Sequence, residues 1–257
     1  MPPSQTTALI TGATAGIGHE YAVQLAARGD DLVLVARDAA RLEPVAEELR
    51  RAHQVEVEVL VADLTDRVAL ARVEARLADR ERPIDLLVNN AGFGLKKRFL
   101  DNTADEETAM LEVLVTAVLR LTHAALGPMA ERGHGGIINV SSVAAFLPRG
   151  SYSAAKAYVN SFGAWAANEY RSKGVTVTTL CPGFTKTEFH ERLGIDRDKS
   201  APSYLWLEAD FLVSECLSDF DKGKTMSVPG GQYKVITTAT RMVPTRVAQR
   251  FQNIGRR

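Results

Sequence analysis

A tyrosine and a lysine stand four residues apart in the stretch YSAAK, as Tyr152 and Lys156. Residues four apart share one face of a helix, so the lysine ammonium can lie near the tyrosine hydroxyl. A free tyrosine has a pKa of about 10 and keeps its proton at neutral pH. A nearby cation lowers that pKa, which makes a better general acid or base. The pair predicts proton transfer, although the same spacing also occurs on ordinary solvated helix faces.

The elements that would position this pair alternate along the chain. Short β-branched runs, bounded by Gly, Asp, Asn or Pro, alternate with longer amphipathic stretches, and this predicts a parallel sheet covered by helices on both faces. The predicted strands are TTALIT (6–11), DLVLVA (31–36), VEVEVLVA (55–62), IDLLVNN (84–90), GGIINVSS (135–142), VTVTTLCPG (175–183) and TMSVPG (225–230). The predicted helices include residues 18–29, 41–53, 67–80 and 105–126, and a helix is expected around 204–220.

The composition fits one α/β domain. The chain has 257 residues, of which 46% are apolar and 24% charged. Its two cysteines, Cys181 and Cys216, offer neither a disulfide framework nor zinc spacing, and the histidines are scattered, so no metal site is expected. The start lacks the pattern of a signal peptide, and we expect no apolar stretch long enough to span a bilayer. A cytoplasmic location follows as the expectation.

A glycine-rich turn follows the first predicted strand, in TGATAGIG at residues 11–18. Glycines 12, 16 and 18 let the backbone turn sharply and approach a pyrophosphate, while the following helix offers free N–H groups. The spacing differs from the usual G-x-G-x-x-G, and a plain tight turn is the alternative. In an alternating α/β chain the turn favours a dinucleotide site, at the carboxyl ends of the strands.

The end of the second strand indicates which dinucleotide binds. An NAD site usually places an acid there, against the ribose 2′-hydroxyl. This chain has Ala36 followed by Arg37, and an arginine attracts a 2′-phosphate. The local charge therefore favours NADP(H).

Taken in order, these motifs resemble the short-chain dehydrogenase/reductase family over nearly the whole chain. The ordered set is TGATAGIG, Asp63 in VADLTD, NNAG at 89–92, Ser141-Ser142, YSAAK, and PGFTKT at 182–187. The resemblance implies a single Rossmann-type domain over residues 1–257, a doubly wound seven-stranded parallel sheet flanked by helices. It implies Ser142, Tyr152 and Lys156 as catalytic residues. Residues implied to bind the cofactor, together with Arg37, are Gly12, Thr14, Ala15, Gly16, Ile17, Gly18, Asp63, Leu64, Asn90, Ala91, Gly92, Tyr152, Lys156, Pro182, Gly183, Thr185 and Thr187.

The expected reaction interconverts a carbonyl and an alcohol on a small, hydrophobic substrate. Hydride passes from NADPH to the carbonyl carbon, Tyr152 donates the proton, and Ser142 orients the oxygen. Two departures from the family pattern leave an alternative, a catalytically weak NADP-binding sensor or assembly protein. The segment between Ser142 and Tyr152 is short, which makes Ser141 a fallback, and Leu114 stands where many relatives have an asparagine that holds a relay water.

Two further segments bear on substrate and partners. A polar, irregular flap is predicted at about 188–222. In the segment 183–211, which includes its first half, Phe184, Phe189, Leu193, Tyr204 and Trp206 would either wall the substrate or pack the flap onto the body. The tail 222–257 has eight basic residues and no acid, so it either neutralises an acidic body or meets a phosphate-bearing substrate or an anionic membrane. Its aromatic residues are too sparse for nucleic acid. By the resemblance, a homodimer or homotetramer would form through residues 105–126 and 151–172.

Replacing Arg37 by Asp should weaken NADPH binding relative to NADH, because a carboxylate there repels the 2′-phosphate. The ratio of the two dissociation constants, measured by titration, should change by about tenfold or more. An unchanged ratio would remove Arg37 from cofactor selection.

Overall fold

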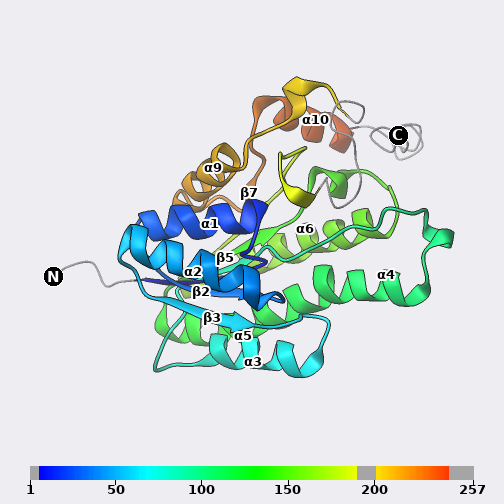
Figure 1. Ribbon diagram of the computed structural model, residues 1–257. Helices are drawn as coiled ribbons and strands as arrows, with labels where there is room; N and C mark the ends of the chain where they lie inside the picture. Colours follow the sequence, from blue (N-terminus) through cyan, green and yellow to red (C-terminus); the bar gives the residue numbers. More distant parts are fainter. Residues whose placement is uncertain (1–5, 190–200, 243–257) are drawn as a thin grey trace.

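The computed structural model describes residues 6–189 and 201–242, and in them seven parallel strands form one sheet (Figure 1). The strands are β1 (Thr7–Thr11), β2 (Asp31–Ala36), β3 (Val57–Val61), β4 (Leu86–Asn89), β5 (Gly135–Val140), β6 (Val175–Leu180) and β7 (Met226–Ser227). Their order is β3-β2-β1-β4-β5-β6-β7, and every pairing is parallel. All seven predicted strands are therefore confirmed, as is the doubly wound sheet.

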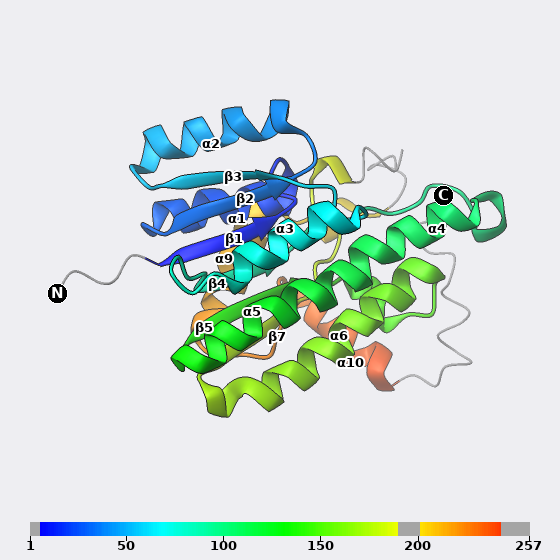
Figure 2. The same ribbon diagram turned by 90° about the horizontal axis from the view of Figure 1, so that it is seen from below.

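Helices cover both faces of the sheet. They are α1 (Gly16–Ala27), α2 (Ala39–His53), α3 (Arg67–Ala78), α4 (Ala104–Leu111), α5 (Val118–Arg132), α6 (Ser151–Tyr170), α9 (Ala209–Asp221) and α10 (Gly231–Met242). Shorter segments are η1 (Phe99–Asp101), η2 (Glu112–Ala117), η3 (Val143–Phe146), η4 (Arg171–Lys173) and η5 (Ser203–Leu205). Helices α1, α2 and α9 pack on one face, and α3, α5 and α6 on the other (Figure 2). Each face buries its own apolar core, which is the layering that the alternating pattern predicts.

The predicted flap helix begins later than expected. We predict a helix around 204–220, but Ser203–Leu205 forms a short 3-10 turn and α9 begins at Ala209. The intervening Leu207 is extended, because its N–H donates to the Phe184 carbonyl and its own carbonyl accepts from Lys186. Leu193 of the flap and the tail after residue 242 lie outside the described residues, so the predicted flap and tail boundaries remain predictions.

One long helix corrects the expectation about membrane spans. Segments α4, η2 and α5 run continuously from Ala104 to Arg132, and this helix is long and apolar enough to cross a membrane by length and composition. The expectation that no stretch has that length is therefore wrong. Half of its most apolar window is buried inside the domain, and the core helix of a soluble protein passes the same test. The apolar character follows from packing against the sheet and α6, so it assigns no membrane.

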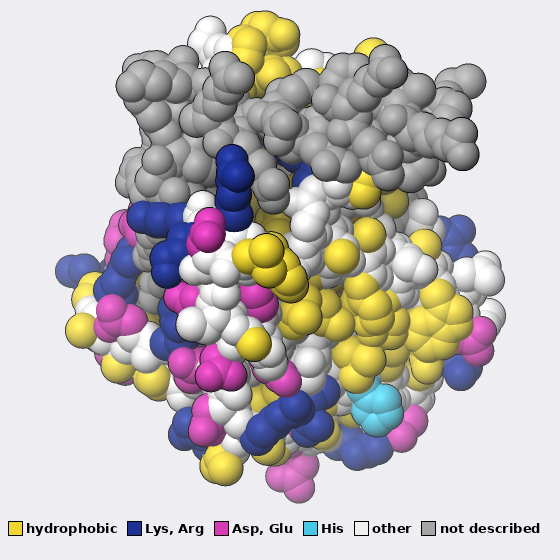
Figure 3. Space-filling model, turned by 90° about the vertical axis from the view of Figure 1, so that its right-hand side faces the viewer, with side chains coloured by type: hydrophobic (Ala, Val, Ile, Leu, Met, Phe, Trp, Pro, Cys, Tyr) yellow, Lys and Arg dark blue, Asp and Glu magenta, His cyan; other side chains and the backbone are white. Residues whose placement is uncertain are grey.

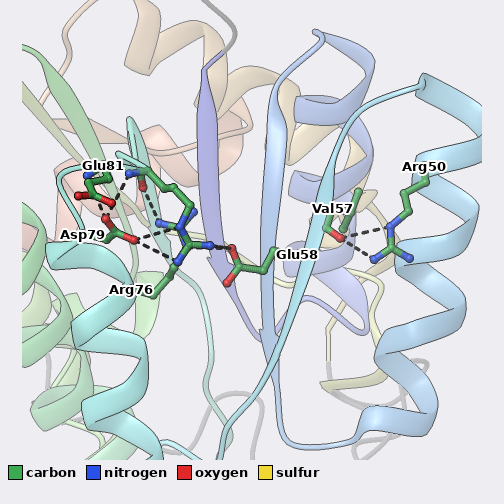
Figure 4. A network of polar contacts seen from close by, with 7 residues as sticks. Arg50, Val57, Glu58, Arg76, Asp79 and Glu81 are labelled. Atoms are coloured by element: carbon green, nitrogen blue, oxygen red, sulfur yellow. Dashed lines mark hydrogen bonds and ion pairs between the residues drawn. The ribbon is translucent and has the colours of Figure 1, made fainter.

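Two arginines brace the edge strand β3 from both sides (Figure 4). Arg50 of α2 donates from Nε to the Val57 carbonyl at 3.2 Å, while Arg76 of α3 donates from Nε to Glu58 Oε2 at 2.8 Å. The Arg76 side chain is only 8% exposed, whereas its partner Glu58 is 36% exposed, so the ion pair is partly shielded from solvent. Side chains of opposite charge at a sheet edge hold the strand in place and discourage pairing with another chain.

The strand order determines where a ligand can lie. The chain winds outward from β1 to β3 and then crosses back to β4, so β1 and β4 are neighbours that run into helices on opposite faces. In open parallel sheets, ligands bind beyond the carboxyl ends of the strands at this switch point.

Candidate active site

The predicted motifs meet at one edge of the sheet. Gly12 follows β1, Arg37 follows β2, Asp63 comes shortly after β3, Asn90 follows β4 and Ser141 follows β5. Since all strands are parallel, their carboxyl ends lie at the same edge. Pro182, shortly after β6, accepts a hydrogen bond at its carbonyl from Val143 N at 2.9 Å, which brings the last motif to the serine pair.

The glycine-rich turn is shaped to receive a ligand. Gly12 and Gly16 have φ of 70° and 56°, a region that favours glycine. A Cβ on Gly12 would lie 2.9 Å from Ala91 Cα, and one on Gly18 would lie 2.3 Å from the Gly12 carbonyl oxygen. Helix α1 follows with Ala15 as N-cap, and no side chain caps its first turn. The turn therefore offers backbone N–H groups in a close cradle, the arrangement that binds phosphates.

Asn90 braces this turn against β4. Its Nδ2 donates to the Thr11 carbonyl at 2.9 Å and to the Gly12 carbonyl at 3.2 Å. In return, Thr11 Oγ1 accepts from the backbone N–H groups of Asn90 and Ala91, each at 3.0 Å. The Asn90 side chain thus holds the two sides of the switch point together, in addition to lying at the predicted cleft.

The predicted adenosine end brings Arg37 and Asp63 together. Arg37 Nη1 lies 3.9 Å from Asp63 Oδ2, and the Arg37 side chain is 67% exposed. The other oxygen of Asp63 accepts from the N–H and hydroxyl of Thr65 at 2.9 and 2.8 Å. Leu64 is 6% exposed and belongs to the apolar core, so its side chain does not face this site.

A second arginine at this end was not singled out from the sequence. Arg41 Nη2 lies 3.4 Å from the Thr14 carbonyl and 2.8 Å from Glu188 Oε1. It lies in the first turn of α2, where Asp38 caps the helix by accepting from Arg41 N at 3.2 Å. The cap signal at Asp38 could have placed Arg41 beside the glycine-rich turn, because first-turn residues lie at the same sheet edge as the strand end.

Tyr152 and Ser142 lie together at the start of α6. Tyr152 is the second residue of the helix, and its hydroxyl interacts with the Ser142 hydroxyl through a hydrogen bond that lowers its pKa. Ser142 Oγ also accepts from Ala144 N at 3.1 Å, and Ser142 is the N-cap residue of η3. The short segment between the two residues therefore does not separate them. The fallback residue Ser141 is 3% exposed and donates to the Lys156 carbonyl at 2.9 Å, so its hydroxyl is engaged.

The predicted lowering of the Tyr152 pKa is wrong. Burial raises the pKa of Tyr152 to about 12, and the Ser142 hydrogen bond offsets only part of that rise. The cation expected beside the hydroxyl lies elsewhere: Lys156 Nζ is 5.8 Å from the Tyr152 ring centroid and donates to the Val140 carbonyl at 2.7 Å. The helical spacing predicts a shared face, but it does not predict that the ammonium turns to a strand end.

Lys156 is itself strongly desolvated. Lys156 is only 5% exposed, and this burial lowers its pKa to about 8. Leu114, in the π-helical segment η2, is 1% exposed, and a Cβ on Gly92 would lie 2.9 Å from Leu114 Cδ2 and 3.9 Å from Lys156 Nζ. Leu114 therefore forms an apolar wall near the ammonium, where a polar side chain would solvate it.

The loop after β6 is held by a tyrosine that the sequence did not reveal. Tyr233 of α10 donates its hydroxyl to the Leu205 carbonyl at 2.6 Å and accepts from Phe184 N at 2.8 Å. Its ring packs on Gly183, where a Cβ would lie 2.0 Å from the ring. Tyr233 thus joins both arms of the flap to the C-terminal helix. No motif spacing marks this residue, because the contact depends on how α10 docks.

The two threonines predicted in this loop face different ways. Thr187 packs over the glycine-rich turn, since a Cβ on Gly16 would lie 3.0 Å from its Cβ. Thr185 is 2% exposed and donates to the Gly183 carbonyl at 3.1 Å, so its side chain supports the loop. Of these two threonines, Thr187 is the one whose side chain lies next to the predicted phosphate cradle.

Of the predicted apolar wall, Phe189 lies beside Tyr152. Its ring centroid is 6.2 Å from that of Tyr152. The rings of Phe184 and Trp206 are in tilted contact, with centroids 5.2 Å apart, and Phe184 packs against the core, so these two hold the flap to the body. Tyr204 is 71% exposed. Within residues 6–189 and 201–242, no group of three His, Cys, Asp or Glu side chains is placed to hold a metal ion.

Comparison with known proteins gives consistent matches. The family model described as short chain dehydrogenase matches residues 6–198. The very-long-chain 3-oxoacyl-CoA reductase of Anas platyrhynchos is 36% identical over 203 residues, which are 76% of this chain and 64% of that relative. The chain thus spans less than two thirds of the length of that relative.

Solved structures match over more of the chain. A short-chain dehydrogenase from Sphingobium yanoikuyae in complex with NADPH has 37% identity and a TM-score of 0.84, covering 92% of this chain and 94% of that one. The bulky-bulky ketone specific alcohol dehydrogenase from Comamonas testosteroni has 33% identity and a TM-score of 0.80, covering 92% of both chains.

Replacing Lys156 by Met should remove the pH-dependent cost to stability that the buried ammonium imposes on the parent protein. The pKa of Lys156 is about 8 in the folded protein against 10.5 for a free lysine, so between these values the unfolded chain binds a proton that the folded chain does not. The free energy of unfolding of the parent protein therefore rises across this window, by about 3 kcal/mol, and is lower below it. The Met variant lacks this rise, so its advantage is largest below the window and shrinks through it.

Urea unfolding of both proteins at several pH values measures this difference. Replacing the exposed Lys222 by Met is the matched control and should leave the pH dependence unchanged. If Lys156→Met and the parent protein keep a constant difference from neutral to alkaline pH, the desolvation of Lys156 is not the cause.

Proposed function

The chain belongs to the short-chain dehydrogenase/reductase family, and from that premise we propose that it is an NADP(H)-dependent oxidoreductase that reduces a carbonyl group on a bulky, largely apolar substrate. The observation that carries the proposal is the placement of Tyr152. Its hydroxyl interacts with Ser142 at the sheet edge where the glycine-rich turn lies, and Lys156 is anchored one helical turn away.

The residues present fit a dinucleotide with a 2′-phosphate. The turn at Gly12 and Gly16 leaves no room for a Cβ at its closest approach, and the uncapped start of α1 offers N–H groups to the pyrophosphate. Arg37 and Arg41 bring two guanidinium groups to the end of β2, where they would meet the 2′-phosphate. The similar structure from Sphingobium yanoikuyae, which holds NADPH, supports the same choice.

In the proposed reaction, the protein supplies the proton and the orientation. When bound, the reduced nicotinamide would supply a hydride to the carbonyl carbon. Ser142 donates a hydrogen bond to the carbonyl oxygen and orients it beside Tyr152. As charge develops on that oxygen, the Tyr152 hydroxyl transfers its proton to it. Lys156 is positively charged at neutral pH and, with its ammonium 5.8 Å from the Tyr152 ring centroid, would stabilise the phenolate that forms, although it does not lower the resting pKa of Tyr152.

Burial of Tyr152 keeps the phenol in the protonated form that reduction uses. With its pKa raised to about 12, the phenol is fully protonated at neutral pH and is ready to act as an acid. The alkoxide formed from a ketone is a stronger base than a phenolate, so the transfer runs downhill. Oxidation of an alcohol would need the phenolate first, which burial disfavours.

The apolar substrate class rests on Phe189 and on the relatives. Phe189 lies beside Tyr152 and would contact an apolar group next to the reacting carbonyl. Two of the relatives described above are named for very-long-chain 3-oxoacyl-CoA and for bulky ketones. Both names describe a carbonyl that carries large groups.

A homodimer in the cytoplasm is part of the same proposal. Helix α6 carries a stacked row of Tyr158, Phe162 and Trp165, with centroid distances of 5.6 and 5.7 Å, and Trp165 is 52% exposed. Leu111 and Leu119 of the neighbouring helix are also exposed. Figure 3 shows apolar side chains gathered over this face, to the right of the view. A second copy of the chain, packed helix to helix, would cover it.

Replacing Tyr152 by Phe should abolish reduction while leaving NADPH bound, because only the proton donor is removed. We expect the turnover number with a bulky ketone to fall by about 100-fold or more, measured by NADPH absorbance. Tyr158→Phe removes a hydroxyl from the outer face of the same helix and should keep the parent rate.

The NADPH dissociation constant of each variant, measured by fluorescence titration, separates binding from chemistry. Full turnover in Tyr152→Phe would contradict the proposed mechanism. If the parent protein binds NADPH but reduces none of a broad panel of ketones, the alternative of a sensor or assembly protein is favoured instead.

A further inference from the structure

The helix that carries Tyr152 begins without a cap of its own. Helix α6 starts at Ser151, and its N-cap residue is Gly150, which has φ of 102° and makes no side-chain cap bond. The first turn of an uncapped helix frays most readily, because its N–H groups have no partner within the helix. Tyr152 lies in that turn, so the proton donor would be among the least ordered residues unless another element holds it.

A buried carboxylate from α4 contacts this turn. Glu107 is 9% exposed, and its Oε2 accepts a hydrogen bond from Ser151 Oγ, the residue next to Tyr152. Its Oε1 accepts from Asn102 Nδ2 at 2.8 Å. Both oxygens are therefore engaged, one on the tyrosine helix and one on the loop before α4. A negative charge at the N-terminus of a helix also interacts favourably with the helix dipole.

Glu107 is not needed by its own helix. The N-terminus of α4 is closed by a capping box, in which Thr103 Oγ1 accepts from Glu106 N at 3.1 Å and Glu106 Oε2 accepts from Thr103 N at 2.7 Å. Glu106 and Glu107 are thus adjacent carboxylates with separate partners. Burial of a carboxylate is costly unless it is hydrogen-bonded, and the partners of Glu107 lie outside α4.

We propose that Glu107 is a positioning residue for the reduction: it ties the first turn of α6 to α4 through the Ser151 hydroxyl and so helps to hold the Tyr152 hydroxyl beside Ser142. The inference rests on the proposed function of Tyr152 as the proton donor. Glu107 acts through Ser151 and has no role in binding the cofactor or the reacting carbonyl. Proton transfer depends steeply on the distance and angle between donor and acceptor, so a loosened first turn lowers the rate of the chemical step.

The test compares two neighbouring glutamates in the full-length protein. In Glu107→Gln, the negative charge at the start of α6 is lost, and the single amide oxygen can replace only one of the two carboxylate oxygens as an acceptor. We expect its turnover number to fall about tenfold, with the NADPH dissociation constant and the ketone KM within about twofold of the parent. Glu106→Gln breaks the capping box of α4 and should keep the parent turnover number, even where it lowers the unfolding temperature.

Variants of Ser151 test the same contact from the other side. Ser151→Ala should lose as much turnover as Glu107→Gln, and the double variant should lose no more than either one. Ser151→Thr keeps the hydroxyl and should keep the rate. Because Ser151 lies at a helix start, these variants test the contact even if Glu107→Gln does not fold.

A second readout is independent of activity. Backbone amide exchange in the first turn of α6, residues 151–155, should become faster in Glu107→Gln and stay unchanged in Glu106→Gln. Parent turnover and parent exchange in Glu107→Gln would overturn the proposal, even if Tyr152→Phe is inactive. Full turnover in Tyr152→Phe would instead overturn the proposed function, and faster exchange in Glu107→Gln would still show that the carboxylate holds the first turn of α6.

Discussion

Two hydrogen bonds between Lys156 and the end of β5 determine where the chemistry can occur. Lys156 Nζ donates to the Val140 carbonyl at 2.7 Å, and Ser141 Oγ donates to the Lys156 carbonyl at 2.9 Å. Adjacent residues of one strand end thus hold both the side chain and the backbone of one helical residue. This fixes the rotation and the axial position of α6 relative to the sheet. Tyr152 lies one turn earlier on the same helix, so these bonds bring that turn to the sheet edge where Ser142 lies.

Burial then sets the protonation of both groups. It raises the pKa of Tyr152 to about 12 and lowers that of Lys156 to about 8, in each case towards the neutral form. Leu114 and the close approach at Gly92 make the lysine side of the site apolar. The result is a phenol that keeps its proton at neutral pH and a lysine whose charge is held at a cost in stability. Functional sites commonly accept such a cost.

The sequence predicts the sheet well, because strand periodicity and the motifs at strand ends depend on local residues. All seven strands were predicted, and the motifs from Gly12 to Pro182 meet at one sheet edge. Features that depend on docking were not predicted. The direction of the Lys156 ammonium depends on a strand carbonyl, the contact of Glu107 on how α4 lies against α6, and that of Tyr233 on α10. The long apolar helix at residues 104–132 was also not predicted, since its apolar character reflects burial in the core.

The protonation of Tyr152 in solution tests the central claim most directly. The ring Cζ carbon of labelled tyrosine shifts when the hydroxyl ionises, and the Tyr152 signal is the one missing from the spectrum of Tyr152→Phe. Burial of this phenol, with a pKa of about 12, predicts that its signal does not titrate between about pH 6 and about pH 10. A titration centred at about pH 7 would contradict the account, because the charge of Lys156 would then outweigh burial in determining the pKa of Tyr152.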